Sequence, residues 1–437
     1  MNKLRKFDPR THDEGLVRSL SRDLKVSDAH EKAPLVSFLE AEKQPIHRWF
    51  YVREGFSPRL VHQAVDELGL RAGGRILDPF CGGGTTLLAS QQRGLSSTGF
   101  DVNPLMAYVS RVKTRPYTQK DFEDVGRLIG KMRDANFKPA LSAPPELDAE
   151  RVFSDKRRNV LEKLLMFKEF TTKVDSQTSR DFLMLGWLSI LEQASNMRRG
   201  GTGLRYEPRY GKDPKKLLFE KYALTLGDLK TLVRDKQPRP EAIVIKDSFL
   251  ASSSKVADAS ADAVITSPPY PNCFDYAQIY GIELYMGDFV KDERGLEAVN
   301  DGAIRSHMNM KLAQGRKWGN KRLTESLSRL LRRIPLAHLW DPKIPVMLDG
   351  YFADMEAAIR LMHAKLAPGG AAVLVAGNVS YGGAIIPVDL MLSQIALDAG
   401  FKDISVQVVR LLAPELPPEQ LAAGGKLLRE SVISMRK

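Results

Sequence analysis

The chain has 437 residues, of which 43% are hydrophobic and 27% charged, a composition typical of a globular protein that buries a sizeable core. No apolar run reaches the roughly 18 residues that a membrane-spanning helix needs, so the sequence predicts no membrane span and no membrane partner. The formal charge is +12 and the pI is near 9.5, which favours an anionic partner, most simply nucleic acid.

The two cysteines and seven histidines exclude several kinds of site. Cys81 and Cys273 cannot form a disulfide framework or a four-cysteine zinc site, and the histidines lack HxxxH spacing, so we predict no structural metal. The N-terminal residues are charged and have no apolar segment behind them. They do not resemble a secretory signal, and we expect a cytoplasmic protein.

The first part of the chain combines an irregular segment with one clear helix. Residues 1–45 are polar and show no sustained periodicity, so we expect a weakly structured arm with at most one helix. After it, Ser57 is suited to cap a helix that has Pro58 at its first position. The apolar residues of this helix fall on one face, and they are Leu60, Val61, Ala64, Val65 and Leu68.

Residues 75–101 contain a strand, a glycine-rich turn, a helix and a second strand. Residues 75–78 form the first strand, 79-PFCGGGTTLLASQQRG-94 the turn and helix, and residues 97–101 the second strand, which ends on Asp101. This βαβ order implies a parallel sheet covered by helices. Ligands of such sheets bind at the carboxyl ends of the strands, where glycines allow the backbone to approach them closely.

The glycine turn favours a nucleoside-like cofactor that has no phosphate to bind. Glycines 82–84 match neither the GxGxxG fingerprint of dinucleotide sites nor a phosphate loop, and the turn has no lysine. Asp101 is placed to accept hydrogen bonds from ribose hydroxyls, and Asp78 beside the turn suits a cationic group. The alternative role of Asp101 is to cap the turn that follows it.

The remainder of the chain alternates between helical, α/β and basic segments. Residues 116–240 show long helical stretches bounded by SAPPE and QPRPE, which predict an inserted helical subdomain. Residues 196–240 hold twelve Lys or Arg against five Asp or Glu, and residues 305–345 hold ten against two. The α/β elements are expected at 242–250 (strand), 261–270 (strand), 351–366 (helix), 371–378 (strand), 387–401 (helix) and 404–412 (strand).

These patterns divide the chain into six segments. The catalytic domain is expected in three parts, at residues 46–115, 241–290 and 346–437. Residues 1–45 are the N-terminal arm. The helical insertion at 116–240 is the candidate target-recognition region, and the basic insertion at 291–345 is a candidate DNA contact.

The motifs DPFCGGGTT (78–86), GFDVNP (99–104) and TSPPY (266–270) together resemble S-adenosylmethionine-dependent DNA amino-methyltransferases, especially those specific for cytosine N4. The resemblance implies an α/β fold with a Rossmann-like, mostly parallel, seven-stranded sheet, and S-adenosylmethionine as the cofactor. It also implies cofactor contacts from the glycine turn, the second-strand acid and a motif after the third strand. In this sequence those residues are Asp78, Pro79, Phe80, Gly82, Gly84, Thr85, Asp101, Asp247 and Ser248.

The same resemblance assigns catalysis to Ser267, Pro268, Pro269 and Tyr270. An exocyclic amine is a poor nucleophile because its lone pair is delocalised into the ring. Acceptors out of the ring plane, Ser267 Oγ and the carbonyl near Pro268, would hold the amino hydrogens and direct the lone pair at a methyl group. Prolines keep that carbonyl rigid, because they fix φ and supply no N–H. Tyr270 would stack on a base flipped out of the duplex.

Two groups of basic residues are candidates for DNA contact. The first lies in a glycine-rich loop of the helical insertion and the second in the basic insertion. A solvated charged face is the alternative for both groups. The candidates are Arg198, Arg199, Arg205, Arg316, Lys317, Lys321 and Arg322.

Within the family, serine before Pro-Pro-Tyr is more typical of cytosine-N4 enzymes. We therefore predict site-specific methylation of cytosine N4 in double-stranded DNA, with a cognate restriction endonuclease as a candidate partner. The alternatives are an adenine-N6 enzyme, a tRNA guanine-N2 enzyme and a DNA-binding subunit that has lost catalysis. The tRNA enzymes share a DPFCG-type turn but usually carry aspartate before the prolines, and intact Asp101, Ser267 and Tyr270 disfavour an inactive subunit.

Overall fold

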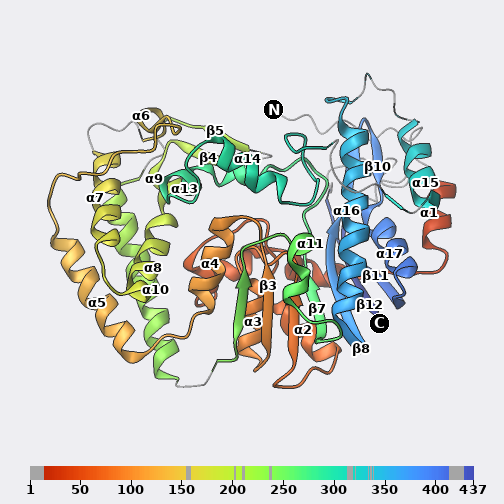
Figure 1. The fold of residues 1–437 in the computed structure, drawn as a ribbon, viewed down its shortest axis with the longest axis horizontal. Coiled ribbons are helices and arrows are strands. Elements are labelled where there is room, and N and C mark those ends of the chain that lie inside the picture. The colour runs from red at the N-terminus through yellow and green to blue at the C-terminus, as the bar shows by residue number, and fades with distance from the viewer. Residues whose placement is uncertain are drawn as a thin grey trace.

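A computed structural model of the chain shows one eight-stranded sheet with helices packed on both faces (Figure 1). The structure describes residues 14–153, 159–200, 203–208, 212–235, 239–312, 318–319, 321–332, 334, 337, 339–412 and 428–437. In spatial order the strands of the sheet are β1 (Lys25–Asp28), β11 (Lys402–Leu411), β12 (Arg429–Arg436), β8 (Leu366–Gly377), β7 (Ala261–Thr266), β2 (Arg75–Asp78), β3 (Ser96–Phe100) and β6 (Ala242–Ile245).

Neighbouring strands run parallel except at β12, which is antiparallel to both β11 and β8. The predicted Rossmann-like α/β class is therefore confirmed. The sheet has one strand more than the seven expected, because β1 pairs with the outer edge of β11. The sequence patterns also gave no indication of β12, which lies between β11 and β8.

The segment expected to be a weakly structured arm is folded onto the sheet from residue 14 onward. It forms α1 (Glu14–Ser21), β1 and the 3₁₀ turns η2 (His30–Val36) and η3 (Phe38–Lys43). Leu20, Val36 and Phe38 of this segment are buried. Its contribution to the core makes it part of the catalytic domain.

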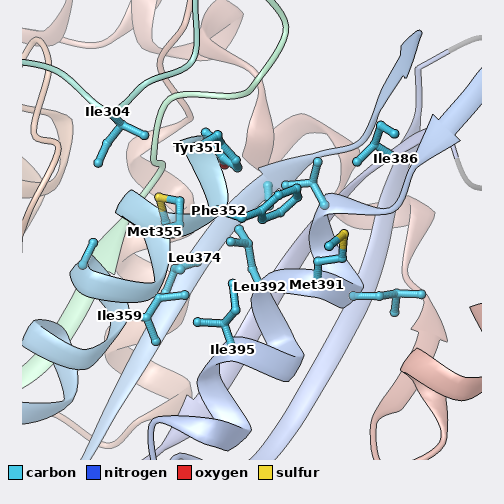
Figure 2. Close-up of a cluster of buried hydrophobic side chains, with 14 of the residues drawn as sticks. Ile304, Tyr351, Phe352, Met355, Ile359, Leu374, Ile386, Met391, Leu392 and Ile395 are labelled. Carbon is cyan, nitrogen blue, oxygen red and sulfur yellow. The ribbon is translucent and has the colours of Figure 1, made fainter. Parts of the chain in front are cut away.

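Alternate residues of the strands face two separate hydrophobic clusters, as the period of a strand requires. On one face, Ile76 and Val375 pack with α2 (Pro58–Glu67) and α3 (Thr85–Gln92). On the other face, Leu77 and Leu374 pack with α16 (Ile344–Lys365) and α17 (Val388–Asp398). Figure 2 shows the second cluster, in which Tyr351, Phe352, Met355 and Ile359 of α16 lie beside Met391, Leu392 and Ile395 of α17.

The predicted start of α2 is confirmed in detail. Ser57 has an extended backbone, its side chain accepts a hydrogen bond from the backbone N–H of Arg59, and Pro58 occupies the first turn. The buried positions of the helix are the ones that its periodicity predicts, apart from Leu68, which lies just after its end. This helix covers the face of the sheet that carries Ile76 and Val375.

The helical insertion has a core of its own beside the β6 edge of the sheet (Figure 1). Trp187 and Tyr222 are fully buried in it, and α4 (Pro104–Thr114) lies between this core and β6. The core also takes in residues 46–52 and 277–290 from the catalytic parts. Its elements are α5 (Gln119–Asp134), α6 (Ala149–Val152), α7 (Val160–Thr172), α8 (Gln177–Leu188), α9 (Leu191–Ala194), α10 (Pro214–Arg234) and a hairpin of β4 (Met197–Gly200) and β5 (Gly203–Tyr206).

The second insertion is attached to the sheet domain by a buried ion pair. Arg305 donates to Asp354 of α16 from its backbone N–H, at 3.1 Å, and from its guanidinium, at 2.8 and 2.9 Å.

No helix in the described part of the chain is both long enough and apolar enough to cross a membrane. The remaining elements are η4 (His47–Trp49), α11 (Phe249–Ser252), η5 (Ser253–Lys255), α12 (Tyr276–Ile279), α13 (Gly281–Met286), α14 (Glu293–Asp301), α15 (Lys321–Arg332), β9 (Val379–Tyr381) and β10 (Ala384–Ile386).

Candidate active site

A cleft of about 320 Å³ lies at the carboxyl ends of β2, β3, β6 and β7. Four segments that follow these strands line it, at residues 79–83, 101–103, 247–249 and 267–270. This is the edge of a parallel sheet at which ligands bind. The glycine turn and the TSPPY corner, which are far apart in the sequence, therefore share one cavity.

Two glycines of the turn have different physical roles. Gly82 lines the cleft with φ at +49°, and a Cβ built on it would meet no atom within 4 Å. Gly84 has φ at +80° and does not line the cleft, and a Cβ there would lie 2.7 Å from Ser110 Oγ on α4. Gly82 thus leaves room for a ligand beside the backbone, whereas Gly84 allows the turn to pack against α4.

Asp101 lies in the cleft directly after β3, and its carboxylate holds the glycine turn. Oδ2 accepts from the backbone N–H of Gly82 at 2.8 Å, and Oδ1 accepts from that of Asn103 at 2.8 Å. Burial raises the pKa of Asp101 to about 6. The turn-capping role and the ligand-facing role are compatible, because each oxygen has a second lone pair for a hydroxyl group.

Asp78 does not face the cleft, in contrast to the predicted cofactor contact. It is 2% exposed, and its Oδ1 accepts from Thr266 Oγ1 at 2.6 Å and from the backbone N–H of Phe80 at 3.1 Å. Burial raises its pKa to about 6. Because Thr266 is the last residue of β7, Asp78 ties the start of the glycine turn to the residue before Ser267. Pro79, Phe80 and Thr85 do line the cleft as predicted.

The segment after β6 adds polar and aromatic groups to the wall. Asp247 accepts from the backbone N–H of Ser248 at 2.8 Å and from the hydroxyl of Ser252, which lowers its pKa. Phe249 lies beside them and packs edge-on against Phe100, with the ring centroids 5.2 Å apart. Phe249 was not predicted as a site residue, because an aromatic side chain after a strand does not distinguish a cavity wall from a core.

The TSPPY corner, which follows β7, forms another part of the lining of the cleft. Ser267 Oγ lies 3.4 Å from the carbonyl oxygen of Val375, a long hydrogen bond. Pro268 is buried and Pro269 half-buried, while the hydroxyl of Tyr270 donates to Glu430 Oε1 at 2.8 Å. All four predicted catalytic residues line the same cleft as Gly82 and Asp101.

Sequence patterns missed a large part of the lining. Seven of the residues 299–307 of the basic insertion, predicted as a DNA contact, line the cleft, and the backbone N–H of Cys273 donates to Ser306 O at 3.1 Å. Other lining residues were missed as well, and only the two aromatic residues Phe274 and Tyr276, shortly after TSPPY, could have been suspected from the sequence. These other residues include Glu54, Asn272, Phe274, Tyr276, Tyr280, Arg410 and Glu430.

Arg199 corrects one predicted DNA contact. It is 7% exposed, its guanidinium donates to Glu192, Glu283 and the carbonyl oxygen of Ile279, and it lies over the ring of Tyr280 at 4.3 Å. A guanidinium enclosed in this way cannot reach a phosphate. It anchors the β4–β5 hairpin to α9 and α13 instead.

The other candidates for DNA contact fall into three groups. Arg198 and Arg205 face each other across the β4–β5 hairpin, and Arg205 is exposed. Lys321 is exposed at the start of α15, whereas the side chain of Arg322 lies outside the described residues. Arg316 and Lys317 also lie outside them.

Neither cysteine is placed for nucleophilic chemistry. Cys81 and Cys273 are buried free thiols. Burial raises the pKa of Cys273 to about 11, and its sulfur lies 3.2 Å from the hydroxyl of Tyr381. A thiol that stays protonated at neutral pH is a poor nucleophile.

No protein-family model matches the chain. The type II methyltransferase M.BsoBI of Geobacillus stearothermophilus is 29% identical over 453 residues, covering 92% of this chain and 88% of that protein. The type II methyltransferase M.AvaI of Nostoc sp. is 29% identical over 446 residues, covering 92% and 89%. Over almost its whole length the chain is therefore similar to type II methyltransferases.

One further relative matches the chain only locally. The tRNA (guanine(10)-N2)-dimethyltransferase of Methanothermobacter thermautotrophicus is 35% identical over 82 residues, covering 19% of this chain and 24% of that protein. The similarity to the type II methyltransferases extends, by contrast, over 92% of the chain. The resemblance to DNA methyltransferases that the three motifs predicted is therefore confirmed.

Proposed function

We propose that this protein is a site-specific DNA methyltransferase that transfers a methyl group from S-adenosylmethionine to N4 of a cytosine flipped out of double-stranded DNA. One observation carries the proposal: the nucleoside cradle at Gly82 and Asp101 and the amine-holding corner at Ser267 line one cleft. Similarity to type II methyltransferases over 92% of the chain supports DNA as the substrate.

The cofactor is S-adenosylmethionine, and the residues of the cleft fit its parts. The open space above Gly82 leaves room for the methionine part of the cofactor beside the protein backbone. The free lone pairs of Asp101 suit the two ribose hydroxyls. Asp247 offers an acceptor and Phe249 an apolar surface, as an aminopurine ring requires. When bound, the cofactor supplies a methyl group on a positively charged sulfur.

The chain's own contribution to catalysis is to hold and activate the amine. Ser267 Oγ and the carbonyl of the Pro268 region accept the two amino hydrogens out of the plane of the base. The nitrogen then becomes pyramidal, and its lone pair is directed into the cleft. The same acceptors stabilise the positive charge that develops on nitrogen, because they are fixed before the reaction begins, and one of the two amino hydrogens then leaves as a proton to solvent.

Rigidity of the corner follows from its two prolines and from the buried contact of Thr266. The two prolines restrict φ, and Thr266 is bonded to the buried Asp78 at 2.6 Å. Asp78 in turn accepts from Phe80 of the glycine turn at 3.1 Å. The distance between the amine-holding corner and the cofactor cradle is thereby set by buried contacts, and no covalent enzyme intermediate is needed.

The choice of cytosine over the alternatives depends on Ser267. A base inside a duplex must be extruded to reach this cleft, at a cost on the order of a few kcal/mol, and Tyr270 provides a ring for it to stack on. Adenine N6 presents the same chemistry, and the tRNA guanine-N2 alternative has support only from the local match. The serine before Pro-Pro-Tyr favours cytosine N4.

The test is to identify the methylated nucleoside. The protein is incubated with isotopically labelled S-adenosylmethionine and separately with unmethylated plasmid DNA, genomic DNA and tRNA, and the digested nucleosides are analysed by mass spectrometry. We expect labelled N4-methylcytosine in DNA and none with Ser267→Ala. Labelled N6-methyladenine in DNA would show the base to be wrong, and label confined to tRNA would show the polymer to be wrong.

A further inference from the structure

Glu430 and Arg410 line the cleft but have no role in holding the cofactor or the amine as proposed. Glu430 is 4% exposed and lies near the start of β12. Its Oε1 accepts from the hydroxyl of Tyr270 at 2.8 Å, and its Oε2 lies 2.7 Å from Arg410 Nη2. A carboxylate buried at this depth needs such partners, and here both come from other elements.

Strand register explains how Tyr270 reaches a residue two strands away. Arg410 of β11 is opposite Glu430 of β12, and Glu430 is opposite Gly377 of β8, so the three residues form one row across the sheet. A Cβ on Gly377 would lie 2.7 Å from Cε2 and 2.9 Å from Cδ2 of Tyr270. The missing side chain at Gly377 is therefore what lets the ring cross β8 and place its hydroxyl on Glu430.

The electrostatics of the row keep this hydrogen bond in one direction. Burial, followed by the neighbouring Glu430 carboxylate, raises the pKa of Tyr270, so the phenol stays protonated and donates. Burial also raises the pKa of Glu430, but the adjacent Arg410 opposes that shift. The donor and acceptor roles are thus assigned before any base is present.

We propose that Glu430 is a positioning residue, which holds the ring of Tyr270 in its base-stacking orientation through the phenolic hydroxyl. Arg410 holds the Glu430 carboxylate, and Gly377 provides the space for the ring. The inference rests on the proposed function, since it takes Tyr270 as the surface on which the flipped base stacks. A ring that is already fixed loses no rotational freedom when the base arrives, so the complex forms in a reactive geometry.

The test is a double-mutant cycle on the full-length enzyme with the nucleic acid that the wild type methylates. We expect single-turnover methylation at saturating cofactor to slow about tenfold in Tyr270→Phe and in Glu430→Ala, and the double variant to be no slower than either. Glu430→Gln keeps an acceptor oxygen and should stay within about twofold of the wild type. The affinity for S-adenosylhomocysteine should not change in any of them.

Two further variants separate positioning from a general loss of structure. Tyr351→Phe removes a buried hydroxyl on α16, outside the cleft, that has no hydrogen-bond partner among the described residues, and should leave the methylation rate unchanged. Gly377→Ala pushes on the ring of Tyr270 while both hydrogen-bonding partners remain, and should slow methylation as Tyr270→Phe does. Gly377→Ala also provides the test if Glu430→Ala does not fold.

The outcomes distinguish this inference from the proposed function. A wild-type rate in Glu430→Ala, or slowing by Tyr270→Phe and Glu430→Ala that adds up in the double variant, overturns the inference alone. Methylation of adenine or of RNA would show that the proposed substrate is wrong, and the double-mutant cycle would then be measured on the nucleic acid that is methylated. Absence of methylation of every nucleic acid by the wild type overturns both.

Discussion

The two walls of the cleft are built in different ways. The wall at Gly82, Asp101 and Asp247, where we propose that the cofactor binds (the cofactor wall), consists of turns that directly follow three adjacent parallel strands, and backbone N–H groups set the orientation of its carboxylates. The wall at Ser267 and Tyr270, where we propose that the base binds (the base wall), depends on side chains that reach it from other parts of the chain.

The two walls should therefore be sensitive to different substitutions. A backbone-built wall tolerates most side-chain substitutions outside its glycines and its ligand-facing acid. A wall assembled from remote side chains responds to substitutions far away in the sequence, as at Glu430, which lies 160 residues from its partner Tyr270. Loss of function from changes at the cofactor wall should therefore appear as weaker cofactor binding, and from changes at the base wall as slower chemistry.

Ser267→Ala tests the base wall and should cause the greatest loss of methylation rate. Ser267→Ala removes an acceptor aimed at the amine, and loss of one such preorganised group costs on the order of 100-fold or more in rate. We expect single-turnover methylation to fall by at least that factor, measured with saturating cofactor and DNA. Calorimetric titration with S-adenosylhomocysteine should give the wild-type affinity, and a large loss of affinity would show that the two walls are not separate.

Asp101→Ala is the reciprocal test at the cofactor wall. It removes the acceptor for two hydroxyl groups, and hydrogen bonds to a charged group contribute about 1.5–3 kcal/mol each. We expect the affinity for S-adenosylhomocysteine to fall roughly 100-fold or more, while the rate at saturating cofactor falls much less. An Asp101→Ala enzyme that binds normally but does not turn over would contradict the assignment of Asp101 to the cofactor.

The same contrast explains how much of the site could be predicted from the sequence. Gly82 and Asp101 lie within one βαβ unit, so their chemistry and relative position can be inferred from local pattern. Glu430 and Gly377 could not be predicted, because strand pairing alone brings them beside Tyr270. Arg199 shows the opposite error: its loop suggested a phosphate contact, but Glu192 and Glu283, from other elements, neutralise it in the interior.

Two features of the fold were missed for a related reason. The four residues of β1 are all exposed, so the strand has no hydrophobic periodicity, and only its parallel pairing with β11 defines it. The hairpin of β4 and β5 likewise has few buried positions. β7 was predicted because it is a nearly continuous buried apolar run, and α2 was predicted because its buried residues repeat with the helical period.

The pH dependence of cofactor binding offers a smaller and more specific test of the cofactor wall. Asp101 accepts hydroxyl hydrogens best when ionised, and burial raises its pKa from an ordinary value near 4 to about 6. Affinity should therefore be constant above pH 6 and fall toward tenfold per pH unit as the pH drops below 6. Asp101→Asn should bind more weakly at neutral pH and lose most of this dependence.

The raised pKa of Asp101 has the opposite effect on stability: acidification should weaken cofactor binding but increase the free energy of unfolding. Between pH 4 and 6 the native Asp101 binds a proton more readily than the unfolded chain does, so its contribution to the free energy of unfolding rises as the pH falls through this range. Urea denaturation of the wild type without cofactor should show this rise relative to Asp101→Asn. A difference between the two proteins that does not vary between pH 4 and 6 would contradict the raised pKa.

The smallest expected effects distinguish the two glycines of the turn. Gly82→Ala places a methyl group in the open cleft and costs about 1 kcal/mol of stability for its positive φ, but it should weaken cofactor binding because it occupies the ligand's space. Gly84→Ala adds a clash with Ser110 to its positive φ, so it should destabilise the fold by roughly 2–3 kcal/mol. The cofactor affinity of the folded Gly84→Ala enzyme should change less than that of Gly82→Ala. Equal losses of stability and affinity in both variants would mean that the turn acts as one packed unit rather than as a ligand surface backed by a packing surface.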